Sequence, residues 1–264
     1  MNRAEYDKLP ALNWSRAKLL LRSPMHFACG YEPEDTEALQ VGRLTHAMVL
    51  EGKGLEGVFA IKPKGMSFAT RDGKAWRDAQ SLPILPADDR ARILGMAEAL
   101  AADKAAEKMI RSCPLREHIV TATMHGVKCK AMLDAVGNDR DGLPGFLEVK
   151  TSTDAREDFW QRRCCSEPFH YDGGCEWYSS LLSLSLDLNG ARPWGVWLVV
   201  ESKPPHAVAC WAPDETMIAS GVEKVRDVLT SWKACQASGE WPSYHRGIRL
   251  ISAPKWRMNQ LANL

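Results

Sequence analysis

The stretch VKCKAMLDAVGNDRDGLPGFLEVKT, residues 127–151, decides the fold of this chain. It contains two largely apolar runs, at 127–136 and 146–151, each with the length and composition of a β-strand. Between them, residues 137–145 are rich in Gly, Pro, Asn and Asp, which favour turns. A hairpin is the simplest connection, so the stretch predicts two adjacent strands of a sheet.

Three charged side chains belong to these strands. Side chains alternate along a strand, so Glu148 and Lys150 share one face. The hairpin would bring Asp134 close to Glu148, and two such carboxylates repel each other unless a divalent cation joins them. Lys150 could then balance the charge of a scissile phosphate or orient an attacking water. The pattern predicts a metal-dependent nuclease centre, although a surface ion pair on an edge strand would give the same E-x-K triplet.

Working outward, the remaining sequence predicts helices and further strands. The expected helices cover 14–22, 38–51, 87–112, 154–165, 170–187 and 214–236. The expected additional strands cover 58–61, 117–123, 194–201 and 206–211. Residues 62–74 are polar and basic, so we expect a mobile loop there. This order predicts an α/β fold, a central sheet flanked by helices with a helical N-terminal elaboration.

The length of 264 residues favours one elaborated domain. Hydrophobic residues make up 45% and charged residues 25%, as in ordinary soluble globular proteins. Within the domain 1–264 we expect a mainly helical part over 1–112 and a sheet core with the active site over 113–211. A C-terminal helix and tail would complete the domain over 212–264.

The composition also excludes several classes of protein. The longest apolar run, 194–200, is far shorter than the roughly 20 residues of a membrane span. Residues 1–5 do not open a signal peptide, so we expect a cytoplasmic protein with no membrane partner. The eight cysteines show no C-x-x-C spacing and predict reduced thiols rather than a zinc or iron–sulfur site. A net charge of +1 fits a local basic groove on a neutral body, or no nucleic acid at all.

Several short motifs occur in a characteristic order. They are SRAKLLLRSPMHF (15–27), GRLTH (42–46), VLE (49–51), TRDGK (70–74), the strand 126–134, LEVKT (147–151), WP (241–242) and PKW (254–256). Together they resemble the RecE-like exonucleases of phage recombination, relatives of lambda exonuclease in the PD-(D/E)XK nuclease superfamily. The resemblance covers most of the chain and implies the restriction-endonuclease-like core of that superfamily, with a central mixed sheet.

The resemblance also implies roles for individual residues. The resemblance implies two catalytic Mg²⁺ ions, which Mn²⁺ can replace, and their implied ligands are Asp134, Glu148, His46 and the backbone carbonyl of Val149. Lys150 would be the catalytic lysine, and Tyr178 would lie beside the site on the following helix. A lone histidine on an apolar helix is usually structural, and only the GRLTH match makes His46 a candidate ligand.

The basic stretch 62–77 contains the candidate DNA contacts. These are Lys62, Lys64, Arg71, Lys74 and Arg77, which would grip DNA phosphates or else form a solvated face. Phe68 and Trp76 lie among them, and stacking on bases and burial in a core are both compatible with the sequence.

The activity that the resemblance implies is resection of linear double-stranded DNA ends in the 5′-to-3′ direction. The single strands would serve phage-type homologous recombination by strand annealing, with an annealing protein of the RecT or Redβ kind as partner. A homo-oligomeric ring, a trimer or tetramer, would encircle the DNA in the bacterial host of a phage or prophage. The alternatives are a PD-(D/E)XK endonuclease or structure-specific nuclease, and a catalytically weak DNA-binding or scaffold subunit.

The chain departs from the family pattern at two places. Gly174 stands where the family carries Gln in Q-x-x-x-Y, so an amide that would contact DNA or water is missing. This departure favours the weak-subunit alternative and weakens the expected helix start. The family's arginine near Met132 is also absent, and Lys128 or Lys130 could substitute for it.

Overall fold

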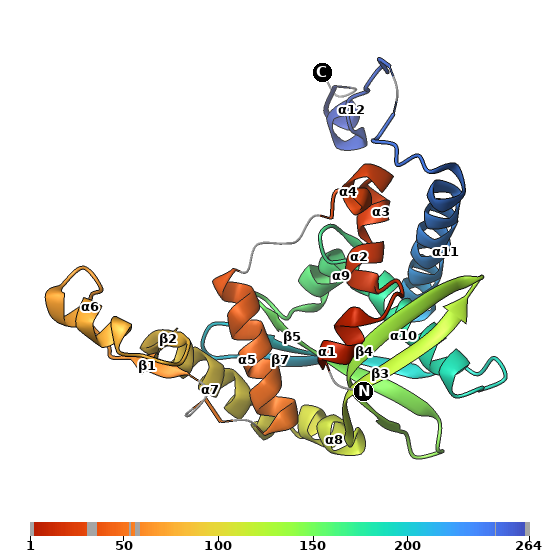
Figure 1. Cartoon of the computed structure of the whole chain (residues 1–264). Coiled ribbons are helices and arrows are strands. Elements are labelled where there is room, and N and C mark those ends of the chain that lie inside the picture. The colour runs from red at the N-terminus through yellow and green to blue at the C-terminus, as the bar shows by residue number, and fades with distance from the viewer. Residues whose placement is uncertain (1–2, 31–35, 53, 56–58, 246, 262–264) are drawn as a thin grey trace.

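The computed structural model describes residues 3–30, 36–52, 54–55, 59–245 and 247–261. A five-stranded mixed sheet lies between two layers of helices (Figure 1). A smaller pair of strands and a helix form an arm on one side of this body, and the C-terminal helix α12 (Lys255–Leu261) stands apart on another. The α/β class with a central mixed sheet is therefore confirmed.

The central sheet has the order β3-β4-β5-β6-β7. Its strands are β3 (Leu115–Met124), β4 (Val127–Asn138), β5 (Pro144–Ser152), β6 (Trp194–Glu201) and β7 (Val208–Trp211). Neighbours pair antiparallel except β5 and β6, which are parallel. The expected hairpin is present, because β4 and β5 pair with Ala135 opposite Leu147.

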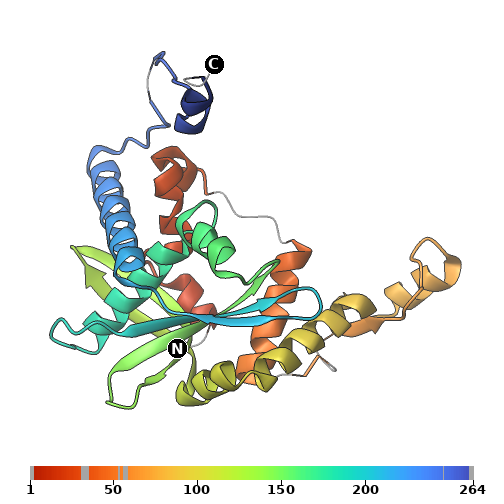
Figure 2. The same cartoon turned by 180° about the vertical axis from the view of Figure 1, so that it is seen from behind.

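Helices cover both faces of the sheet (Figures 1 and 2). On one face, α10 (Tyr171–Ser185) packs on the strands and α11 (Glu215–Ser238) packs on α10. The other face is covered by α7 (Ala87–Ala102) and α8 (Lys104–Ser112), with α5 (Glu37–Glu51) against α7. Two apolar cores result: one contains Trp177 and Phe146, and the other contains Ile93 and Leu147.

The chain begins with four short helices, where one helix at 14–22 was expected. They are α1 (Arg3–Lys8), α2 (Trp14–Ala17), α3 (Leu19–Arg22) and α4 (Pro24–Ala28). The helix α4 begins at an N-cap. The Ser23 hydroxyl accepts a hydrogen bond from the backbone N–H of His26, and Pro24 occupies the first helical position. The helix α9 (Glu157–Cys165) likewise begins three residues later than expected.

The helix α4 contacts the segment that follows α11. The ring of Phe27 stacks on Trp241, with centroids 5.2 Å apart, and the backbone N–H of Met25 donates to the carbonyl of Pro242. The SPMHF and WP motifs therefore have a structural role, in which they bind each other. No helix in the described ranges is both long and apolar enough to cross a lipid bilayer.

The single helix expected over 87–112 is wrong, because the chain breaks it at Asp103. This residue is extended (φ −76°, ψ 117°), and its carboxylate accepts hydrogen bonds from the backbone N–H groups of Ala105 and Ala106. A side chain that satisfies two N–H groups at a helix start competes with continuation of the preceding helix. The break turns α8 toward β7 and β4.

We expect Asp103→Ala to lower the free energy of unfolding by about 1 kcal/mol, since both backbone N–H groups lose their acceptor. Urea denaturation followed by circular dichroism measures the change. The matched control is Glu98→Ala, at an exposed position inside α7, which should change stability by less than about 0.5 kcal/mol. Equal stabilities for the two variants would contradict the capping role.

The arm differs from the mobile loop expected at 62–74. The strands β1 (Ala60–Lys62) and β2 (Ile84–Pro86) pair in parallel, and α6 (Arg71–Asp78) lies between them in sequence and projects from the body (Figure 1). The hydroxyl of Thr70 accepts from the backbone N–H of Gly73 and starts this helix. Residues 63–70 form the expected loop, but the expectation was wrong for residues 71–74, because this capping signal was hidden in a polar stretch. The first residue of the strand expected at 58–61 lies outside the described residues.

Candidate active site

The site lies where β4 and β5 separate. Their ladder joins residues 135–138 to 144–147 and goes no further. Beyond it, side chains replace the missing backbone bonds: the N–H of Val149 donates to Oδ2 of Asp134 at 2.8 Å. In return, the N–H of Asp134 donates to Oε1 of Glu148 at 3.3 Å. The divergence of the strands therefore holds both carboxylates in fixed positions.

Lys150 completes the part of the site that comes from β5. Its Nζ donates to Oε2 of Glu148 at 2.7 Å, so the two side chains share one face as alternation requires. The ammonium also lies over the ring of Tyr171, 5.8 Å from its centroid. Tyr178 packs edge-on against Phe146, which precedes Lys150 by four residues on the same strand, and the two ring centroids lie 5.8 Å apart. Both tyrosines thus form the wall behind the lysine.

His46 reaches the site from α5, which passes close to β5. A Cβ at Gly42 would lie 3.4 Å from Oγ1 of Thr151, so glycine permits this close approach. One helical turn later, Nε2 of His46 lies 3.1 Å from Oδ1 of Asp134. The GRLTH and LEVKT motifs, about a hundred residues apart, are therefore in contact. The structure brings together the carboxylates, the lysine and the histidine that the sequence singled out.

The charges in the site influence one another strongly. Burial, followed by the charge of Asp134, raises the pKa of Glu148. Burial acts in the same direction on Asp134, but the nearby Lys150 and His46 outweigh it and lower the pKa of that carboxyl. For Lys150, burial acts to lower the pKa, but Glu148 and Asp134 outweigh it and raise the pKa above its ordinary value. Asp134 is therefore ionised and Lys150 protonated over the ordinary pH range.

The residues present fit a divalent metal. Nε2 of His46 is shielded from solvent and has no hydrogen-bond partner of suitable geometry within the described part of the chain. It lies 3.1 Å from a carboxylate oxygen of Asp134, and adjacent ligands of one octahedral ion, each at about 2.1 Å from it, lie about 3 Å apart. A bound cation would also relieve the raised pKa of Glu148. These residues and the carbonyl of Val149 are the candidate ligands.

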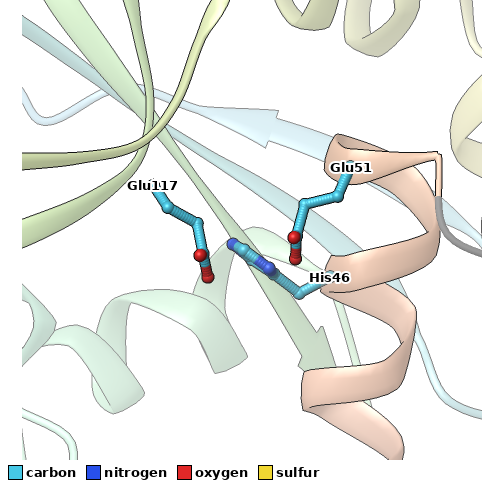
Figure 3. Close-up of side chains that lie close together, drawn as sticks. All are labelled: His46, Glu51 and Glu117. Carbon is cyan, nitrogen blue, oxygen red and sulfur yellow. The ribbon is translucent and has the colours of Figure 1, made fainter. Parts of the chain in front are cut away.

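Two glutamates near His46 were missed as candidate ligands in the sequence. Glu51 ends α5 and Glu117 lies in β3, and one ligand atom from each, with one from His46, all lie within 4.8 Å of one another. Figure 3 shows the imidazole between the two carboxylates. Glu51 belongs to the VLE motif and could have been proposed from it. Glu117 carries no local signal, because only the pairing of β3 with β4 brings it here.

The site opens into a pocket of about 300 Å³. Its described lining includes His46, Glu51, Glu117, Asp134 and Lys150, and two arginines, Arg3 and Arg43. The arginines come from α1 and α5 and were not singled out in the sequence. A pocket lined by arginines as well as carboxylates suits an anionic substrate held through metal ions.

The expected DNA contacts lie on the arm, and none of them lines this pocket. Arg71, Lys74 and Arg77 are exposed on α6, and Arg77 pairs with the adjacent Asp78. The Lys62 ammonium lies over the ring of Phe68, 4.7 Å from its centroid, whereas Lys64 is 4.0 Å from Asp88. Phe68 and Trp76 stack on each other with centroids 6.3 Å apart and form a small aromatic cluster of the arm.

The Gly174 departure is explained by Trp14. A Cβ at Gly174 would lie 3.1 Å from Cδ1 of Trp14, and one at Gly173 would lie 2.3 Å from Cζ2 of the same ring. The indole packs on Trp177 as well, and its Nε1 donates to the carbonyl of His170 at 3.1 Å. The helix α10 runs through both glycines because the indole covers them. Trp14 thus occupies the space next to position 174.

The suggested substitute Lys130 is wrong as a substrate contact. It is buried, and its Nζ donates to the carbonyls of Tyr6 at 2.7 Å and Leu9 at 3.0 Å. Lys130 therefore anchors the first helix to β4. Lys128 is exposed at the far end of the same strand.

Comparison with known proteins agrees with this geometry. The solved structure of a candidate exonuclease from Eubacterium rectale aligns over 100% of this chain and 99% of that chain, with a TM-score of 0.60 and 11% identity, and so shows the same fold. The protein SSO0001 aligns over 70% of this chain and 84% of that chain at 15% identity, but its TM-score of 0.28 carries no argument. None of the curated proteins matches the chain. The profile of a PDDEXK-like domain of unknown function, DUF3799, matches residues 15–253, and the chain therefore belongs to this PDDEXK-like family.

Proposed function

We propose that this chain is a metal-dependent exonuclease that degrades one strand of double-stranded DNA from a linear end. One observation carries the proposal: two carboxylates, a lysine and a histidine lie together beside one pocket, which all of them except the buried Glu148 line. They are Asp134, Glu148, Lys150 and His46. The PDDEXK-like family and the shared fold support nuclease chemistry at this place.

Each residue has a distinct task in this proposal. Asp134, Glu148, His46 and the Val149 carbonyl would hold two Mg²⁺ ions, which Mn²⁺ can replace. Such ions, when bound, stabilise the charge of the scissile phosphate and lower the pKa of water. Lys150, held protonated beside Glu148, contacts the phosphate or orients the water. Burial raises the pKa of Tyr178 well above its ordinary value, so its hydroxyl stays protonated behind the site.

The motif resemblance supports a more specific biological setting. We propose 5′-to-3′ resection in the cytoplasm of a bacterial cell, for recombination of phage or prophage DNA by strand annealing. The partner would be a single-strand annealing protein of the RecT or Redβ kind. A ring of three or four copies would enclose the duplex, which requires positive charge only along its channel and so suits the net charge of +1.

Digestion of linear duplexes labelled at one 5′ or one 3′ end tests the activity and its direction. With Mg²⁺ we expect early release of the 5′ label and late release of the 3′ label of the same strand, and none with a chelator. Cutting of a closed circular duplex would favour an endonuclease. An absence of degradation with Mg²⁺ and with Mn²⁺ would favour the DNA-binding subunit to which Gly174 pointed.

The arm provides a separate test of DNA binding. The double variant Arg71→Ala/Lys74→Ala should bind linear duplex more weakly at every sequence, because it loses phosphate contacts. The slope of log K against log salt concentration should become shallower by about 1 to 2, at about 0.9 per phosphate. Fluorescence anisotropy with chelator present measures the slope. The matched control is Lys104→Ala/Lys108→Ala on exposed positions of α8, and equal slopes for both variants would exclude the arm as a DNA contact.

A further inference from the structure

Glu51, Glu117 and His46 come from separate places in the chain and meet in the pocket. Glu51 is the last residue of α5, five residues after His46, and Glu117 lies on the edge strand β3. One ligand atom from each lies within 4.8 Å of the other two. Ligands on opposite sides of one ion, at about 2.1 Å each, are about 4.2 Å apart, so the three side chains can close on a single cation with small adjustments.

The conformation of Glu117 brings its carboxylate toward a second carboxylate. The pairs Arg116–Ala135 and His118–Leu133 flank Glu117, which therefore lies next to Asp134 of β4 although these two residues do not form a pair of the ladder. Like charges on neighbouring strands are destabilising when their side chains approach each other. Glu117 also has φ of +45°, which is rare for a residue other than glycine. The sheet thus places two neighbouring acids beside the histidine rather than separating them.

His46 provides the independent sign of a ligand. Its Nε2 is shielded from solvent and has no hydrogen-bond partner of suitable geometry among the described residues, although carboxylates surround the ring. A buried ring nitrogen whose neighbouring carboxylate oxygen is poorly aligned for a hydrogen bond is poorly satisfied, and coordination of a cation satisfies it. The same nitrogen lies 3.1 Å from Oδ1 of Asp134, whereas Oδ2 accepts from the N–H of Val149. One carboxylate oxygen of Asp134 therefore faces His46, and the other faces the backbone of β5.

We propose that Glu51, Glu117 and His46 bind the outer of two divalent cations, and that Asp134 lies between this ion and an inner ion at Glu148. The inference rests on the proposed function for the inner ion, and it adds two ligands that the motifs did not assign. The inner ligands are all oxygens, which suit Mg²⁺. The outer set includes an imidazole nitrogen, which makes Mn²⁺ a better occupant than Mg²⁺.

The number of bound ions tests the proposal. Equilibrium dialysis with Mn²⁺, with free ion measured by electron paramagnetic resonance, should give two ions per chain in the parent. The variant Glu51→Gln/Glu117→Gln should keep one ion and bind the second at least about tenfold more weakly. Glu148→Gln should lose the other ion instead. Added Mg²⁺ should displace the inner Mn²⁺ before the outer one.

A matched control guards against a general charge effect. Glu98→Gln/Glu223→Gln removes two exposed carboxylates on α7 and α11 and should still bind two ions. Thermal unfolding verifies that each variant is folded. If the double variant does not fold, the single variants Glu51→Gln and Glu117→Gln replace it in the ion-binding measurement. Two ions bound with parental affinity in the Glu51 and Glu117 variants, or one ion in the parent, would overturn the proposal.

The count of ions is separable from nuclease activity. If DNA degradation occurs but the parent binds one ion, the outer site is refuted while the proposed function stands. If degradation is absent but two ions bind and the Glu51 and Glu117 variants lose one, the outer site stands while the proposed function fails.

Discussion

Lys150→Ala should lower the rate of linear duplex degradation by about a thousandfold, the largest loss that we expect from one substitution. The ammonium is held at 2.7 Å from Glu148 and is the one cation on the face of β5 that bears the site carboxylate, among the described residues of that strand. Removal of a preorganised charge that stabilises the transition state commonly costs about 10²- to 10³-fold. Glu148→Gln should cause a loss of similar size, because a neutral amide binds a divalent cation poorly.

Initial rates on an end-labelled duplex, at saturating Mg²⁺, measure both losses. Lys128→Ala is the matched control, since Lys128 is an exposed lysine on the neighbouring strand β4 and should be substituted without loss. Thermal unfolding separates loss of chemistry from loss of fold. Parental rates in both Lys150→Ala and Glu148→Gln would refute the site.

Trp14→Ala should lower the free energy of unfolding by about 3 to 5 kcal/mol, the largest stability change that we expect. The indole is buried, packs 5.8 Å from Trp177 and covers the glycines of α10. Its removal leaves a cavity and takes away one of two donors to the His170 carbonyl, which also accepts from the backbone N–H of Gly174. Urea denaturation measures the loss. A decrease below about 1 kcal/mol would show that α2 does not contribute to this core.

A double-mutant cycle tests the contact between Trp14 and Gly174. Gly174→Gln should destabilise the parent by about 1 to 3 kcal/mol, because its Cβ would lie 3.1 Å from Cδ1 of the buried Trp14 ring, which would have to shift. In the Trp14→Ala background the same change should cost less, since the indole no longer fills the space. Purely additive free energies would show that Trp14 does not occupy the place of the glutamine. The exchange explains how the chain can lack the family residue without a cavity.

The sequence predicted what depends on local periodicity. Alternation along β5 placed Glu148 and Lys150 on one face, and turn residues at 137–145 identified the hairpin that delivers Asp134. His46 required a motif, because a helix pattern says nothing about which strand the helix approaches. The contact depends on the missing side chain of Gly42, beside Thr151.

Other features depend on contacts that no local pattern contains. Glu117 reaches the pocket only through the register of β3 on β4 and through a backbone conformation unusual for glutamate. The break at Asp103 and the start of α6 at Thr70 are capping effects, in which one side chain outweighs the helical or loop tendency of its neighbours. Lys130 was expected to substitute for the family's arginine and is instead buried under α1.

The stacking of Phe27 on Trp241 has a topological consequence. It brings α4 and the segment after α11 to one point, so the chain between Phe27 and Trp241 forms a loop that this contact closes. The segment that contains the fully exposed Ile248, Leu250 and Ile251 leaves the body next to this contact, and it connects the body to α12.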